Sequence, residues 1–263
     1  NFIFSKMADE GLPFESALSL AQKEGFAEPD STFDISGQDA AQKTIILATL
    51  SFFKHAAIEN IYFEGIDKVT PQDISFGKQL ELILKPLSVG QLSEDKITLG
   101  SFPAFVKEKS LLASIENESN AVLMNAENVG ETMYAGPGAG AKPTSNSVLS
   151  DIIDIATGKI FDYQKFVESP IASSFENFSC GHYLRFIVND EPGVVAKIST
   201  ALAANNLSID NLIQNESDRE DDAIPLVIVI SNSKEKIMQN TISELQKLPE
   251  VKNSISHIRI LDI

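Results

Sequence analysis

Apolar positions in the first part of the chain recur three and four residues apart, which is the spacing of one face of a helix. Two short helices are predicted within residues 2–24, separated by the Gly-Leu-Pro break at residues 11–13. Residues 25–36 are polar and include a proline, so we expect a loop there. Small and apolar residues from 37 to 54 then predict a longer helix that soon enters the core.

The pattern next changes to an alternation of apolar and polar residues, which predicts strands. These strands are expected at residues 61–66, 79–90, 95–107 and 120–135. Between the first two, the sequence T-P-Q-D at residues 70–73 has the threonine, proline and acidic residue that start a helix. A further helix is expected at about residues 144–157, after a glycine-rich run.

The C-terminal part of the chain follows a strand–helix–strand order twice. Its predicted strands lie at 183–188, 207–214, 224–230 and 251–260, and its predicted helices lie at 194–205 and 234–248. Residues 159–180 lack periodicity, which is typical of a linker. We therefore expect an α/β (α+β) fold: a mixed-sheet domain at residues 1–158, then a βαββαβ, ferredoxin-like domain at residues 181–263.

Composition narrows the classes of partner. The chain carries 37 acidic and 21 basic residues, a formal net charge of −16, which argues against nucleic acid or an anionic membrane. Neither an 18-residue apolar run nor a signal-peptide pattern occurs, so the cytoplasm is the expected compartment. Cys180 is the only cysteine and the three histidines are scattered along the chain, so we expect no metal site.

Three acidic residues precede a single lysine near the start of the third predicted helix. The acidic residues are Glu28, Asp34 and Asp39, and the lysine is Lys43. Asp39 and Lys43 are four residues apart, so they share one helix face. Three carboxylates and one amine, brought together, suit a small zwitterion that carries a hydroxyl group. The alternative is an ordinary solvated pair on the protein surface.

Two long, ordered blocks of sequence resemble the homoserine dehydrogenase family. The first block holds N-F-I-F-S-K-M at residues 1–7, G-F-A-E-P-D at 25–30, then Asp34 and G-Q-D-A-A-Q-K at 37–43. The second block holds Asn120, Y-A-G-P-G-A-G at residues 134–140, Pro143-Thr144 and Asp151. The region from residue 181 resembles the ACT domain, a regulatory module for small ligands, and its N-D-E-P-G turn at residues 189–193 strengthens that resemblance.

The resemblance implies a reaction and a role for each charged residue. The family interconverts L-homoserine and L-aspartate 4-semialdehyde with NAD(P), on the route to threonine, methionine and isoleucine. Lys43 would give or take the proton of the reacting oxygen, while Asp39 would hold Lys43 and contact the substrate. Glu28 and Asp34 would accept hydrogen bonds from the substrate ammonium.

The resemblance also implies a cofactor that this chain binds only in part. The family holds NAD(P) mainly through a separate dinucleotide-binding domain, and no G-x-G-x-x-G turn follows a strand here. We therefore expect the chain to be the C-terminal portion of a longer enzyme and to be inactive alone. Gly25 and Gly140 match family glycines that lie at the cofactor. The alternative is that the glycines at 136–140 only allow close packing against that other domain.

In the ACT-like region, the resemblance implies a regulatory amino acid, with L-threonine as the expected effector. We expect it near Asp190, Gly193 and Val194, because backbone N–H groups at a helix start can hold a carboxylate. Asn211 and Gln214 on the next strand would add side-chain contacts. The alternative is a module that only joins subunits through the edge of its sheet.

Two further interpretations belong to other functional classes. One is a regulatory fragment that binds amino acids without catalysis, and the other is a scaffold that only oligomerises. Binding of homoserine or threonine would exclude the scaffold, and turnover would exclude the regulatory fragment. In the dehydrogenase interpretation, the resemblance implies a homo-oligomer, a dimer or tetramer, joined through the first domain.

Overall fold

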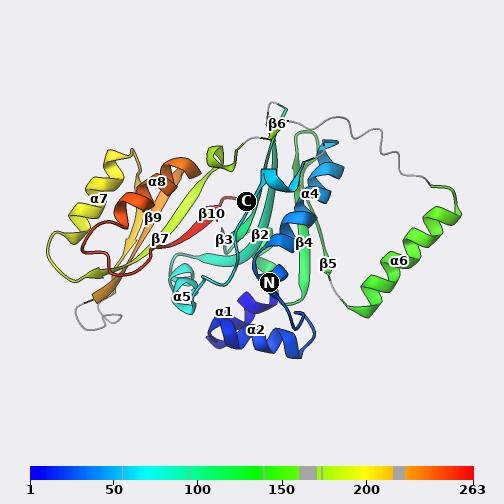
Figure 1. The fold of residues 1–263 in the computed structure, drawn as a ribbon, viewed down its shortest axis with the longest axis horizontal. Coiled ribbons are helices and arrows are strands. Elements are labelled where there is room, and N and C mark those ends of the chain that lie inside the picture. The colour runs from blue at the N-terminus through cyan, green and yellow to red at the C-terminus, as the bar shows by residue number, and fades with distance from the viewer. Residues whose placement is uncertain (55, 94, 139, 160–170, 173, 216–222) are drawn as a thin grey trace.

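A computed structural model of the chain shows helices packed on both sides of one large mixed sheet (Figure 1). It describes every residue except 55, 94, 139, 160–170, 173 and 216–222. The helices are α1 (Phe2–Glu10), α2 (Phe14–Lys23), α3 (Thr32–Ile35), α4 (Gln38–Phe52), α5 (Pro71–Gln79), α6 (Ala141–Ala156), α7 (Val194–Ala204) and α8 (Glu235–Leu245). The strands are β1 (Ile61–Phe63), β2 (Leu82–Ser93), β3 (Lys96–Lys107), β4 (Ser119–Ala126), β5 (Gly130–Pro137), β6 (Ile171–Ala172), β7 (Ser179–Asn189), β8 (Ile209–Ile213), β9 (Ala223–Lys234) and β10 (Ser256–Leu261). The predicted mixed-sheet α/β class is therefore confirmed.

The first helices form as their local sequence predicts. Gly11 ends α1 in the left-handed conformation at φ 66°, and Pro13 precedes the first residue of α2. Phe4 and Met7 of α1 pack with Ala17 of α2 in one buried cluster. The two helices therefore pair through a tight turn and cover the lower end of the sheet (Figure 1).

Strand β3 organises the sheet. β2 pairs with it in antiparallel register along its whole length, from Ser93 opposite Lys96 to Leu82 opposite Lys107. Along β3, β6 pairs at residues 96–97, β1 at 99–101 and β10 at 104–106, all parallel to it. Because β2 occupies one edge of β3, these three strands lie end to end along the other edge.

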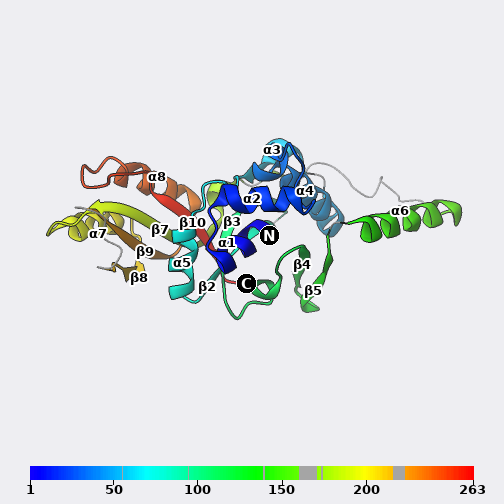
Figure 2. The same ribbon diagram turned by 90° about the horizontal axis from the view of Figure 1, so that it is seen from below.

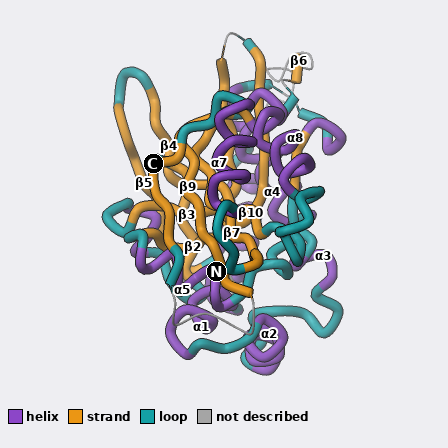
Figure 3. Tube along the Cα trace, turned by 90° about the vertical axis from the view of Figure 1, so that its left-hand side faces the viewer, coloured by secondary structure: helices purple, strands orange, loops and turns teal. Residues whose placement is uncertain are grey.

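The second region follows the predicted βαββαβ order as β7, α7, β8, β9, α8 and β10. Helices α7 and α8 lie over its strands in two views of the molecule (Figures 1 and 3). Ile198 and Leu202 of α7, with Met238 and Leu245 of α8, are fully buried in one cluster with side chains of β7 and β9. Apolar residues three and four positions apart thus put one stripe of each helix into the core.

The sheet does not stop between the two predicted domains. Its strand order is β1-β3-β10-β7-β9-β8, so β10 of the second region pairs directly with β3 of the first. Tyr183, Val227 and Ile258 also belong to the same buried cluster as α1 and α2. The boundaries at residues 158 and 181 remain a prediction, and two regions that share a sheet and a core are expected to unfold together.

Four local predictions were wrong. The loop expected at 25–36 contains the short helix α3, and the single strand expected at 120–135 is the hairpin of β4 and β5. Gly130, at φ 77°, allows the turn that reverses the chain there. Helix α6 begins at Ala141, and residues 179–180 of the expected linker begin β7, while 160–170 and 173 of that linker lie outside the described residues.

Helix α6 extends away from the remainder of the molecule (Figures 1 and 2). Its apolar side chains are exposed: Val148, Leu149, Ile152, Ile153 and Ile155 are each more than half exposed. No residue of this helix is buried. Within the described residues, no helix combines the length and the apolar character that crossing a bilayer requires.

Candidate active site

A cavity of about 320 Å³ lies where α1, α2 and the start of α4 meet the strands β2 and β3. Asp34, Asp39 and Lys43 line it, so the fold brings together three of the four charged residues that the sequence singled out. Glu28 is exposed and its backbone carbonyl accepts a hydrogen bond from Gln22, while the neighbouring Ala27 lines the cavity. A cavity of this volume is of the order that small-molecule sites have.

Lys43 and Asp39 form an ion pair on α4, with 2.5 Å between Nζ and Oδ2. The Lys43 side chain is 69% exposed and that of Asp39 is 33% exposed. An ion pair this open to solvent contributes little to stability, so it is free to serve a ligand instead. The opposite side of α4 anchors the helix, because Ala41, Thr44 and Ala48 are buried there.

The start of α4 is fixed by Gly37. This residue has φ 83°, and a Cβ on it would lie 2.9 Å from the backbone oxygen of Glu64. Helix α3, just before α4, is also tied to the segment after β1, because the Ile66 N–H donates to the Ile35 carbonyl across 3.0 Å. The first turn of α4, which carries Asp39, therefore lies directly against the segment that follows β1.

Glu64 is a cavity residue that sequence reasoning did not identify. It follows β1 at its carboxyl end, and its Oε2 accepts hydrogen bonds from Tyr62 Oη at 2.9 Å and from Arg259 Nη1 at 2.8 Å. The signal in the sequence is Gly65, at which a Cβ would lie 2.9 Å from the Ile35 carbonyl oxygen. A glycine after an acidic residue at a strand end can indicate that another backbone segment packs closely against that position.

Arg259 joins this cavity wall to α8. The guanidinium is 1% exposed, donates to both carboxylate oxygens of Glu235, and lies 4.6 Å from the ring centre of Phe102. Burial alone lowers the pKa of Arg259, but Glu235, Tyr62 and Glu64 outweigh it, so that pKa is raised. Burial raises the pKa of Tyr62 to about 12, so the phenol stays protonated and donates a hydrogen bond to Glu64.

The two glycines expected at the cofactor both adopt positive φ. Gly25, at φ 79°, follows the last turn of α2, where the adjacent Phe26 N–H donates to the Ala21 carbonyl. Gly140, at φ 115°, immediately precedes α6 and lines an open groove with Thr144, Val148 and Ile152. A Cβ on Gly25 would meet no described atom within 4 Å, and one on Gly140 would meet only Pro143, at 3.8 Å.

The residues expected at a regulatory ligand lie at the far end of the molecule from α6 (Figure 1). Gly193, at φ 96°, immediately precedes α7, and Val194 is the first residue of that helix and is buried. Asn211 lies on β8, the edge strand of the sheet, where it pairs with Val229 and has an exposed side chain. Asp190 and Gln214 are also exposed.

Comparison with known proteins assigns the family. The homoserine dehydrogenase family model matches residues 1–153, and the ACT domain model matches residues 182–250. The chain belongs to the homoserine dehydrogenase family. It is 36% identical to the homoserine dehydrogenase of Helicobacter pylori, over 99% of this chain and 62% of that protein, and 35% identical to that of Bacillus subtilis, over 97% and 60%.

Solved structures of this family have the same fold. A homoserine dehydrogenase from Thiobacillus denitrificans is 32% identical with a TM-score of 0.90, and covers 100% of this chain and 62% of its own. The Staphylococcus aureus homoserine dehydrogenase is 27% identical with a TM-score of 0.74. The chain thus spans about 62% of the length of these relatives, and the cavity residues Asp34, Asp39, Lys43 and Glu64 all lie within the part that the family model matches.

Proposed function

We propose that this chain forms the substrate-binding part of an NAD(P)-dependent homoserine dehydrogenase. The enzyme would interconvert L-homoserine and L-aspartate 4-semialdehyde. The cavity that Asp34, Asp39 and Lys43 line together carries this proposal, because it joins an amine and two carboxylates in a space suited to a small amino acid. Family membership over residues 1–153 supports the same conclusion.

Lys43 is the group that moves the proton. Its Nζ is open to the cavity and, among the described residues, forms an ion pair only with Asp39, at 2.5 Å. In the oxidation of homoserine, Lys43 would take the hydroxyl proton as the carbon–oxygen double bond forms, and it would return that proton in the reduction. A positive donor at this oxygen also stabilises the alkoxide-like transition state.

Carboxylates would orient the substrate. Asp39 contacts both Lys43 and the substrate, and Asp34 and Glu28 accept hydrogen bonds from its ammonium group. Asp34 lies on the cavity wall, whereas Glu28 is exposed beside it, so a small movement of the 25–31 loop would complete the set. In this orientation, the hydroxyl end of homoserine points toward α4, which carries Lys43.

NAD(P), when bound, supplies the hydride acceptor or donor. Two glycines of this chain would form part of the NAD(P) site. Gly25 and Gly140 fit that role, because each has open space where a Cβ would lie, so a flat ring can approach their backbone. The remainder of the NAD(P) site is expected in the part of the relatives that this chain does not cover.

The test compares two lysines that are alike in local geometry. Lys6 pairs with Glu10 on α1 four residues away, as Lys43 pairs with Asp39. In an enzyme completed by a dinucleotide-binding domain, Lys43→Ala should remove most turnover and leave cofactor binding, whereas Lys6→Ala should change neither. In the chain itself, Asp39→Asn should weaken homoserine binding by about tenfold or more in calorimetric titration.

Other outcomes of these tests would contradict the proposal or favour one of the alternative functions. Near-normal turnover in Lys43→Ala would contradict the assigned role. Homoserine binding without turnover in the completed enzyme would favour the regulatory fragment, and absence of binding by a folded chain would favour the scaffold. A selective effect of Glu28→Ala on homoserine affinity, and none on NAD(P) affinity, would support the ammonium contact.

A second proposal concerns regulation. The ACT domain match at 182–250 supports an amino-acid effector, for which we propose L-threonine held at Gly193 and Val194 and contacted by Asp190, Asn211 and Gln214. Titration with L-threonine and, as control, L-leucine tests this. Asn211→Ala should weaken threonine binding without changing the fold, because this side chain is exposed on an edge strand. No threonine binding would leave the region as an assembly element.

We also propose that the chain forms a homo-oligomer, a dimer or tetramer, through its first region. The β4–β5 hairpin supports this, because Val122, Met124 and Tyr134 expose apolar surface along it. Tyr134→Asp should lower the mass measured by light scattering. Val129→Asp, at the tip of the same hairpin, is the control, and equal effects of both would contradict this interface.

A further inference from the structure

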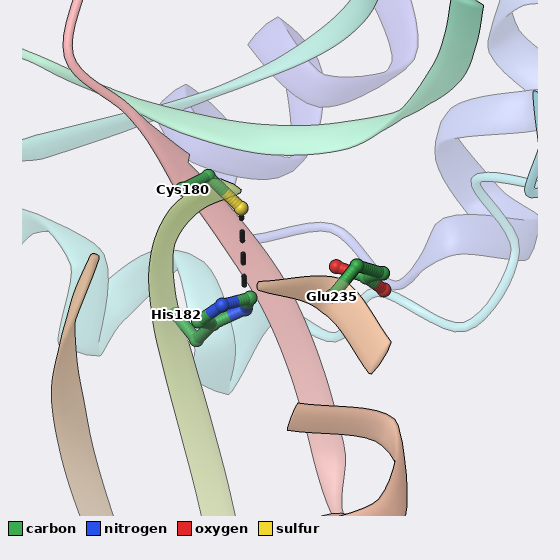
Figure 4. Close-up of side chains that lie close together, drawn as sticks. All are labelled: Cys180, His182 and Glu235. Carbon is green, nitrogen blue, oxygen red and sulfur yellow. Dashed lines mark hydrogen bonds between the residues drawn. The ribbon is translucent and has the colours of Figure 1, made fainter. Parts of the chain in front are cut away.

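Three side chains of the types that bind metal ions lie close together where β7 meets the start of α8 (Figure 4). Cys180 and His182 are two residues apart on β7, and Glu235 is the first residue of α8. Their ligand atoms all lie within 4.8 Å of one another, and the three residues are 4%, 0% and 3% exposed. A sulfur, an imidazole nitrogen and a carboxylate oxygen therefore converge in a buried place.

His257 adds a fourth ligand from the neighbouring strand β10. Its Nε2 lies 3.0 Å from His182 Nδ1, and Cys180 Sγ lies 4.0 Å from the same nitrogen. In a tetrahedral zinc site, nitrogen ligands at about 2.0–2.1 Å and sulfur at about 2.3 Å from the ion lie roughly 3.3–3.7 Å apart. The two observed separations bracket that range, and a Glu235 carboxylate oxygen lies within 4.8 Å of the Cys180 and His182 ligand atoms.

The hydrogen bond on the other side of His182 favours metal binding. His182 Nε2 lies 3.3 Å from the Ser233 carbonyl oxygen, which can only accept, so Nε2 carries the proton. Nδ1 then presents its lone pair toward Cys180 and His257. Imidazole ligands in metal sites are oriented in this way, with one nitrogen on the ion and the other N–H on a carbonyl oxygen.

Charge also favours a cation at this position. Arg259 bears one positive charge between two carboxylates, Glu235 and Glu64, so the group carries one uncompensated negative charge. A divalent ion that displaces the proton of the Cys180 thiol adds one positive charge, and the buried group becomes neutral. Without an ion, a hydrogen bond from His257 Nε2–H to His182 Nδ1 accounts for that pair, and Arg259 pairs with the Glu235 carboxylate.

We propose that Cys180, His182, His257 and Glu235 bind a divalent transition-metal ion of the Zn²⁺ type. The ligands come from β7, β10 and α8, so the ion would fasten these three elements together. The ion would replace one of the two hydrogen bonds that Arg259 donates to Glu235, and the other carboxylate oxygen would keep its bond to Arg259, which holds the wall of the proposed substrate cavity. The site is separate from the proposed dehydrogenase chemistry, and its test does not depend on turnover.

Cobalt(II) is the probe, because its spectrum reports both the geometry and the ligands. Titration of the metal-free chain with Co²⁺ should give one equivalent per chain, the visible bands of tetrahedral cobalt and a thiolate-to-cobalt charge-transfer band. Added Zn²⁺ should displace the cobalt and raise the melting temperature. The Cys180→Ser variant should lack the charge-transfer band, and His257→Gln should bind Co²⁺ about tenfold or more weakly.

A matched control is Glu176→Gln, which removes an exposed carboxylate that pairs with Lys236 of α8 and leaves the four ligands in place. This variant should bind Co²⁺ as the unchanged chain does. A folded, unchanged chain without the charge-transfer band would overturn the proposal, and this outcome needs no variant. Equal Co²⁺ affinity in the unchanged chain, Cys180→Ser and His257→Gln would also overturn it.

Discussion

Arg259 donates a hydrogen bond from Nη1 to the carboxylate of Glu64 across 2.8 Å, although the two residues are 195 positions apart in the chain. The contact exists because β1 and β10 pair end to end along one edge of β3. The same guanidinium also holds Glu235 at the start of α8. One buried side chain therefore connects the ACT region to the wall of the proposed substrate cavity.

Removal of the Arg259 charge should destabilise the whole chain. Arg259→Leu leaves Glu235 as a buried carboxylate without its partner, so we expect a loss of about 3–5 kcal/mol in the free energy of unfolding, measured in urea. Lys107→Leu breaks an exposed pair with Asp262 and should cost less than about 1 kcal/mol. The double variant Arg259→Leu/Glu235→Leu should recover part of the loss. Similar losses in both single variants would contradict a buried network.

Acid should weaken the contact between Asp73 of α5 and Arg185 of β7. Burial alone raises the pKa of Asp73, but hydrogen bonds and charge from Arg185 outweigh it, so that pKa is lowered. Because the pKa of Asp73 is lower in the folded than in the unfolded chain, its ionised carboxylate stabilises the fold at pH values above the unfolded pKa of about 3.9. That stabilisation is lost as the pH falls from there through the lower, folded-state pKa.

The measurement for this pair is the free energy of unfolding between neutral pH and the acid limit of the fold. The unchanged chain should lose stability at the acid end, and Asp73→Asn should be less stable at neutral pH and should lose less on acidification. Asp262→Asn removes an exposed carboxylate and should keep the pH dependence of the unchanged chain. If the Asp73→Asn curve runs parallel to that of the unchanged chain, the linkage argument fails.

Gly37 and Gly11 provide a matched pair of glycine substitutions. Both have positive φ, at 83° and 66°, so alanine carries a backbone cost of about 1 kcal/mol or more at either position. Only at Gly37 would the new Cβ also contact a backbone oxygen, that of Glu64 at 2.9 Å. We expect Gly37→Ala to lower stability more than Gly11→Ala, and to weaken homoserine binding because α4 shifts. Equal effects on both quantities would show that the contact can relax.

Two isoleucines test the packing of the helices. Ile152 of α6 is 56% exposed, whereas Ile198 of α7 is fully buried. In this chain, Ile152→Ala should change the free energy of unfolding by less than about 0.5 kcal/mol, whereas Ile198→Ala should cost about 2–5 kcal/mol. Thermal or urea unfolding of both variants measures this. A large loss for Ile152→Ala would mean that the exposed face of α6 is covered in solution.

Local sequence determined most elements of this protein. T-P-Q-D at residues 70–73 predicted a helix start, and Thr70 and Asp73 do form the reciprocal hydrogen bonds that cap α5. The spacing of Asp39 and Lys43 was enough to place them on one face of α4, where they pair. The short helix α3 and the turn at Gly130 were missed, because a few polar residues support either a loop or one turn of structure.

Tertiary structure alone decided which distant residues meet. Glu64 with Arg259, Asp73 with Arg185, and His182 with His257 are all separated by 75 residues or more, and each pair joins different strands or helices. No local preference encodes these contacts, because they depend on tertiary packing: β1 and β10 both pair with β3, β10 also pairs with β7, and α5 lies against β7. The sequence determined the proposed catalytic pair on one helix, whereas strand pairing produced the cavity wall and the buried ligand group.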